Sequence, residues 1–133
     1  MLENASFSVN IFPDHGTISL TPALGFCPLL QGARLRVLLA RSGRQFSLLD
    51  GAWNVKESQP FQTSQRFGTL SGVQYHVEAA PSIFVTLSFA LVQEIPLFVW
   101  KMVLHNQSGK PIFVQRLEML RTGERFVPSS RMV

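Results

Sequence analysis

Histidines are the residues best suited to bind a metal or to move a proton, and this sequence does not group its three. His15 lies in a turn sequence, His76 on the polar side of a strand pattern and His105 just before a turn. None has a second histidine at the short spacing at which two rings hold one metal ion. The fold could still bring the rings together. The spacing alone predicts surface or turn positions and no metal site.

Carboxylates are the second group that could do chemistry. Asp14 and Asp50 lie in turn sequences, where aspartate bonds its own backbone. Glu78 and Glu118 lie on the polar sides of strand patterns. A glycosidase needs two carboxylates that face one cleft, and nothing in the sequence singles out such a pair. No serine stands in a nucleophile-elbow pattern and the glycines form no phosphate-binding loop. We therefore assign no catalytic residue and no cofactor to this chain.

One aromatic residue stands beside a turn where it could meet a ligand. Asp50-Gly51 is a strong two-residue turn signal, and Trp53 follows it closely. An exposed ring there could stack on a sugar, whereas a buried ring would pack in the core or against another domain, which is the favoured alternative. Asp50 and Trp53 are the candidate contacts to a sugar or an interface. Trp100 stands among apolar residues and is expected in the core.

Composition limits the class of protein. The chain has 133 residues, enough for one domain, and 46% of them are hydrophobic, which excludes an intrinsically disordered chain. Charged residues make up only 15%, against roughly 25% in an average globular protein. The surface is therefore either rich in small polar side chains or covered by something else. The single cysteine, Cys27, cannot form an internal disulfide, and a buried, inert thiol is expected. No signal peptide is recognised, and the longest apolar stretch, 83–92, is too short to span a membrane. These features predict a cytoplasmic protein without a membrane partner.

The net charge of +4 comes mainly from arginine. Four arginines lie close together at positions 34, 36, 41 and 44, and a second set lies near the other end of the chain. A nucleic-acid site would need basic and stacking aromatic side chains on one face. We therefore expect no nucleic-acid partner, and interpret the arginines as solvated strand faces and interface contacts.

Hydrophobic residues alternate with polar ones almost throughout, which predicts β-strands. Residues 33–39 show the pattern with one break at Leu38, so a short helix remains an alternative there. The polar segment 57–67 predicts a long loop or a weak edge strand, and 106–111 predicts a hairpin loop. The predicted strands cover 7–11, 17–20, 33–39, 46–49, 70–79, 83–91, 94–105 and 112–120. Roughly eight to ten strands with regular turn signals predict an all-β, antiparallel β-sandwich over 1–120. Residues 121–133 have no period and are expected to form a linker or tail toward a further domain.

Four stretches together are similar to one known family. They are Gly-Thr-Ile-Ser-Leu-Thr-Pro at 16–22, Pro-Leu-Leu-Gln-Gly-Ala-Arg-Leu-Arg-Val at 28–37, Arg-Phe-Gly-Thr-Leu-Ser-Gly at 66–72, and the strand-loop-strand pattern of 98–118. Their order resembles the opening of α-galactosidase-like enzymes of glycoside hydrolase family 36, the melibiase group. The resemblance implies an N-terminal β-supersandwich that precedes a (β/α)8 barrel carrying two catalytic aspartates. Asp14 and Asp50 lie too early and in turns, so no catalytic role is carried over to this chain.

The sequence leaves three hypotheses about function, of which the first rests on the resemblance and the other two on individual residues. The first is a non-catalytic N-terminal domain of an α-galactosidase-like hydrolase, which packs on the catalytic barrel of the same parent chain and supports homo-oligomer contacts or the rim of the substrate pocket through 50–53. It predicts an exposed apolar patch where the barrel would sit. The second is a free-standing carbohydrate-binding β-sandwich that uses Trp53, with Tyr75 and His76 nearby on one strand. The third is an interaction module whose arginines bind an acidic partner.

Overall fold

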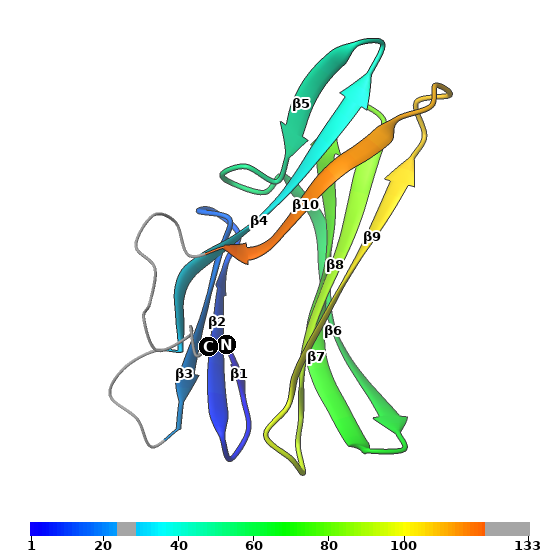
Figure 1. Cartoon of the computed structure of the whole chain (residues 1–133). Helices are drawn as coiled ribbons and strands as arrows, with labels where there is room; N and C mark the ends of the chain where they lie inside the picture. Colours follow the sequence, from blue (N-terminus) through cyan, green and yellow to red (C-terminus); the bar gives the residue numbers. More distant parts are fainter. Residues whose placement is uncertain (24–28, 122–133) are drawn as a thin grey trace.

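The computed structural model of the chain is all-β, with two antiparallel sheets packed as layers (Figure 1). It describes residues 1–23 and 29–121, so Cys27 and the predicted linker beyond Arg121 lie outside the described residues. Ten strands are described: β1 (Leu2–Glu3), β2 (Phe7–Phe12), β3 (Thr17–Pro22), β4 (Leu30–Arg41), β5 (Arg44–Leu48), β6 (Val55–Gln65), β7 (Gly68–Ala80), β8 (Ile83–Val92), β9 (Phe98–Asn106) and β10 (Phe113–Arg121). The predicted fold class, an antiparallel β-sandwich, is confirmed. Within the described part of the chain, no helix is long and apolar enough to cross a membrane.

Strand β4 organises the six-stranded sheet, whose order is β1-β2-β3-β4-β10 with β5 also paired to β4. β3 pairs with the first half of β4 and β5 with the second half, whereas β10 pairs along 34–40. Because a strand has only two edges, β3 and β5 lie end to end on one edge of β4 and β10 takes the other. β10 is therefore an outer strand of this sheet.

The four-stranded sheet consists of β6, β7, β8 and β9 in chain order. Each strand turns back antiparallel onto its predecessor, so the whole sheet is a series of hairpins. The segment predicted as a loop or a weak edge strand forms β6, an edge strand that pairs with β7 alone. Pro60 lies within β6, and proline is tolerated on an edge because one side of the strand makes no ladder bonds. The edge-strand alternative is thus correct.

The predicted hairpin between the last two strands is wrong. Residues 107–112 carry the chain from β9 in one sheet to β10 in the other, where β10 pairs with β4. The loop is held by its own bonds, because the Asn106 side chain donates to the Lys110 carbonyl oxygen at 2.7 Å. Alternation in a sequence predicts a strand but not its partner, so turn residues between two strand patterns do not show whether those strands pair. β9 also begins later than predicted, at Phe98, two residues after Pro96.

The core lies between the inner faces of β4 and β8. On β4 the apolar members of the alternating pattern are buried while Arg34 is exposed and Arg36 half-buried, as the pattern predicts, and the helical alternative is excluded. The buried side chains that form the centre of the core are Leu35, Val37, Leu39, Ile83, Val85, Leu87, Phe89 and Leu91. A second, smaller cluster lies on the outer face of the four-stranded sheet around Leu70, Ala90 and Val92.

Candidate functional site

Trp53, the candidate sugar contact, lies in the core. Its side chain is only 6% exposed, and its ring is stacked on Phe89 with centroids 6.1 Å apart and planes 3° apart. Tyr75 meets it edge-on at 5.9 Å. The backbone amide of Trp53 donates a hydrogen bond to the Pro13 carbonyl oxygen at 2.9 Å. Trp53 is therefore packed in the core, and its ring offers no open face on which a sugar could stack.

The Trp53 indole N–H has no hydrogen-bond partner within the described residues. It lies beside Gly16, whose φ of +68° favours glycine, and a Cβ added to Gly16 would overlap the Gly51 carbonyl oxygen. The turns at 13–16 and 50–52 are thus pressed together over the indole edge. A buried donor without a partner loses its hydration, so the ring is held here by apolar packing.

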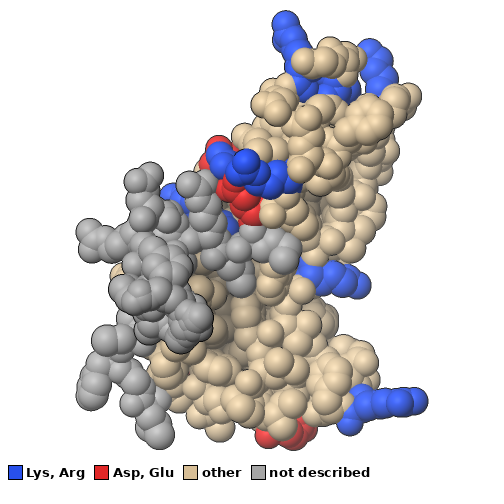
Figure 2. Space-filling view, in the orientation of Figure 1, with Lys and Arg blue, Asp and Glu red and all other residues tan. Residues whose placement is uncertain are grey.

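Asp50, the other candidate, lies at the surface next to a group of charged side chains. Arg36 binds Glu118 through two hydrogen bonds, from Nε at 3.0 Å and from Nη2 at 2.8 Å, while Arg116 Nη1 contacts the same carboxylate at 3.1 Å. The Asp50 carboxylate is 3.9 Å from Arg36 Nη1. The hydrogen bonding of the Arg36 guanidinium to the Glu118 carboxylate raises the pKa of Arg36 despite the opposing effect of desolvation. Figure 2 shows this mixed group of basic and acidic side chains.

The ion pairs of this charged group link β10 to β4. They also engage Arg36, one of the four clustered arginines. Asp50 and Trp53 come from the same turn, yet the structure separates their roles: one faces solvent and the ion pairs, the other the core. The turn therefore does not combine a carboxylate and an open aromatic ring into a single contact surface.

Two of the three histidines meet on the outer face of the four-stranded sheet. Thr86 Oγ1 is 3.2 Å from His76 Nδ1 and 3.4 Å from His105 Nε2. A hydroxyl has one proton, so it can donate to one ring and accept from the other, which couples the tautomers of the two imidazoles. Sequence spacing missed this contact because it depends on the pairing of β7, β8 and β9. Among residues 1–23 and 29–121, no group of three or more histidine, cysteine or acidic side chains could hold a metal ion.

Apolar side chains are exposed along β10, and this surface has the clearest functional implication. Val114 and Leu117 pair with Leu39 and Val37, so they continue the inner face of β4. They share that face because a register shift between Val114 and Arg116 breaks the predicted alternation. Yet Val114 is 55% and Leu117 47% exposed, and Phe113 on the opposite face is 65% exposed. We call these three residues the β10 margin.

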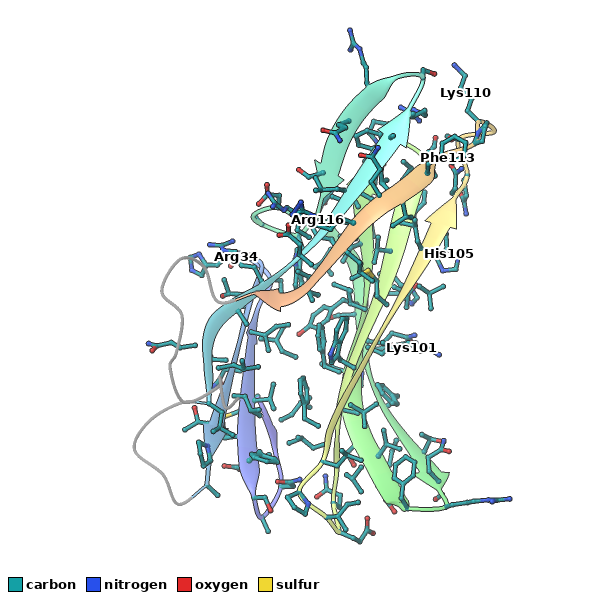
Figure 3. The ribbon with its side chains drawn as sticks, viewed as in Figure 1. Arg34, Lys101, His105, Lys110, Phe113 and Arg116 are labelled. Carbon is teal, nitrogen blue, oxygen red and sulfur yellow. The ribbon has the colours of Figure 1, made fainter. Side chains whose placement is uncertain are left out.

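The exposure of Val114 and Leu117 shows that the four-stranded sheet covers the inner face of β4 but not that of β10. The sandwich is therefore open along this side. In Figure 2, most of the described surface is uncharged outside a few basic and acidic side chains. Figure 3 labels Phe113 and Arg116, which both lie on β10.

A hollow of ≈ 320 Å³ lies on the outer face of the four-stranded sheet. Its lining residues are Phe61, Leu70, Gln74, Ser88, Ala90, Val99, Trp100 and Lys101. The sequence pattern does not predict this hollow, because residues from four strands form it and only their register brings them together.

Comparisons with known proteins leave the structure to be interpreted by itself. No protein-family model, no curated protein and no solved structure matches the chain.

Proposed function

We propose that this chain is a non-catalytic accessory β-sandwich that packs on another domain of its parent protein through the β10 margin. The observation that carries the proposal is the exposure of Val114 and Leu117 on a strand face that is buried one strand further in. An inner sheet face is normally covered by the opposing layer. A partner surface would complete the layer here.

The energetic argument is the cost of leaving this face in water. Burying a Val, Leu or Phe side chain completely stabilises a structure by about 1.5–3 kcal/mol. Val114 and Leu117, half-exposed on one face of β10, thus offer a few kcal/mol to a surface that covers that face. Phe113 lies on the opposite face and adds to the exposed apolar area of the strand. The ion pairs of Arg36 and Arg116 with Glu118 lie on the other face of β10, so they hold the strand in place without covering its apolar side.

We further propose that the parent protein is an α-galactosidase-like glycoside hydrolase. This step rests on the resemblance of the four sequence stretches to the N-terminal supersandwich of that family. It agrees with how the described carboxylates are used, since Glu118 binds Arg36, Glu78 binds Lys56 and the Glu94 carboxylate accepts from the Thr69 amide at 2.8 Å. Under this proposal chemistry belongs to the barrel, and the exposed Asp50 and Ala52 of the predicted rim segment 50–53 are placed to contact a neighbour.

The test uses the complete product of the gene that encodes this chain. The proposal expects a barrel domain encoded in the same reading frame. It also expects the β10 amides to exchange with solvent deuterium more slowly in the complete protein than in the 133-residue chain, since covered strands open less often. An open reading frame that encodes no barrel would contradict the hydrolase proposal. Unchanged deuterium exchange of the β10 amides would contradict the proposed packing surface.

A pair of matched variants identifies the surface. Leu117→Glu places a charge in the β10 margin, and Phe67→Glu places one on a side chain of nearly equal exposure, 46%, in the β6–β7 turn. We expect Leu117→Glu to lower the melting temperature of the complete protein and to restore fast exchange in β10, while Phe67→Glu leaves both unchanged. In the isolated chain the free energy of unfolding of both variants should lie within about 0.5 kcal/mol of that of the original sequence, as is usual for surface substitutions. Equal effects of the two variants on the complete protein would contradict the assignment.

A further inference from the structure

The hollow on the four-stranded sheet follows from the sizes of side chains in neighbouring rows. Gly72, Ala90 and Val99 pair across β7, β8 and β9, and Gln74, Ser88 and Lys101 form the next row. Three of the residues on the middle strands, Gly72, Ser88 and Ala90, are small. Phe61 on β6 and larger side chains on β9 stand on either side. A sheet face with small residues in the middle and large ones around them must be concave there.

The floor of the hollow is closely packed. A Cβ added to Gly72 would overlap the Phe89 carbonyl oxygen on β8, so β7 and β8 approach each other at this point more closely than a larger residue allows. Ala90 is buried and belongs to the small apolar cluster with Leu70, and Phe61 and Val99 pack against it. The hollow is therefore lined by residues that packing holds in place.

The polar side chains that line the hollow are Gln74, Ser88 and Lys101, and each can donate a hydrogen bond. The Gln59 side chain donates to Gln74 Oε1 at 3.3 Å, which leaves the Gln74 amide group to donate. Lys101 carries the only charge among the lining residues. Figure 3 shows Lys101 and His105 projecting from β9 on the outer side of the sheet. An apolar wall with an amide donor and an ammonium group beside it favours a ligand with an apolar body and an anionic end.

We infer that this hollow binds a small amphipathic anion, an apolar ring or short chain that carries a carboxylate. The apolar part lies against Phe61, Ala90 and Val99, and the carboxylate accepts from the Gln74 amide and from Lys101. The volume of ≈ 320 Å³ is at the small end of ligand pockets, which matches a single ring or a short chain. The inference is independent of the proposed function, because the hollow lies on the outer face of the four-stranded sheet and the β10 margin belongs to the other sheet.

Benzoate is the probe, and benzamide is its neutral counterpart of the same shape. The backbone amide signals of β8 and β9 are followed by NMR during titration of the 133-residue chain. We expect saturable shifts at Ser88, Ala90 and Val99 with benzoate. Benzamide should bind about fivefold more weakly than benzoate, because it lacks the negative charge that Lys101 attracts. An exposed ion pair contributes at most about this factor to affinity. Galactose, as a neutral sugar, should produce no saturable shift there.

Three variants separate this site from non-specific binding. Lys101→Gln should weaken benzoate to the level of benzamide, while Lys110→Gln, which removes a charge from the β9–β10 loop, should leave benzoate unchanged. Ser88→Leu fills the hollow and should abolish binding of both probes, with a thermal melt showing that the variant is folded. If Ser88→Leu fails to fold, Lys101→Gln and the comparison of the two probes still decide the matter.

The inference is overturned if benzoate does not saturate, if benzamide binds as tightly as benzoate, or if Lys110→Gln acts as strongly as Lys101→Gln. Saturable binding of galactose at the same amides would also overturn it and would identify a sugar site instead. None of these results bears on exchange in β10, so failure here leaves the proposed function standing.

Discussion

Individual residues in this protein are explained by what their side chains touch. Trp53 is the clearest case, because its turn position predicted an exposed ring as readily as a packed one. The ring lies within an aromatic group in which Phe89 is stacked on Trp53 on one side and on Phe98 on the other. Its contribution is to the stability of the core.

Removing the Trp53 ring should therefore destabilise the fold. We expect Trp53→Ala to lower the free energy of unfolding by about 3–5 kcal/mol, as large buried aromatic residues do. Trp53→Phe should cost only about 1–2 kcal/mol, because the lost indole N–H makes no hydrogen bond to the described residues. Urea unfolding followed by circular dichroism measures both. A loss below about 1 kcal/mol for Trp53→Ala would mean that the ring is not part of the core.

Tyr75 predicts how stability depends on alkaline pH. Burial raises the pKa of Tyr75 above its ordinary value of 10.0, since the phenolate loses hydration between the sheets. The group contributes its full stability below pH 10.0, where it is neutral in both states, and that stability is lost as pH rises toward the pKa of the folded protein.

Tyr75 is the only tyrosine in the chain, so its titration can be observed without interference from another phenol. The ultraviolet absorbance of tyrosinate should appear above pH 10.0 in the folded protein and near pH 10.0 in urea. Tyr75→Phe should flatten the fall of stability over this pH range. Identical titration curves in the folded and unfolded chain would show that the phenol is not desolvated.

Elements differ in how far the sequence determines them. The alternation on β4 and β8 predicts both the strands and their buried faces, because one side chain in two must enter the core. The partner of β10 and its altered alternation could not be predicted, since neither a bulge nor a pairing across 82 positions, as between Arg36 and Glu118, leaves a local signal. The hollow and the contact of His76 with Thr86 were missed for the same reason, because each depends on register.

Amide exchange in the isolated chain should rank the strands by their number of neighbours. β8 has a partner on both sides and buried residues on both faces, whereas β10 pairs with β4 alone. We therefore expect the β8 amides to exchange most slowly and those of 113–118 much faster. Equal protection of β10 at low protein concentration would mean that something in the isolated chain already covers it.

The whole molecule has few charges and an incomplete layer, and the proposed packing on a further domain would explain both facts. Only 15% of the residues are charged, and much of the surface seen in Figure 2 is uncharged. A chain that is partly covered in its parent protein needs fewer charges to stay in solution. The β10 margin and the hollow lie on different sheets, so the proposed packing surface and the proposed ligand site do not compete.

The crossing of β10 from one sheet to the other also sets the order in which the chain can fold. The four-stranded sheet is built from consecutive hairpins between 55 and 106, so its contacts are local and close early. One edge of β4 cannot pair until about 80 further residues have been synthesised, because its partner is β10, the last strand described. During synthesis that edge is an unpaired strand, and a chaperone that covers extended apolar segments would have its best target there.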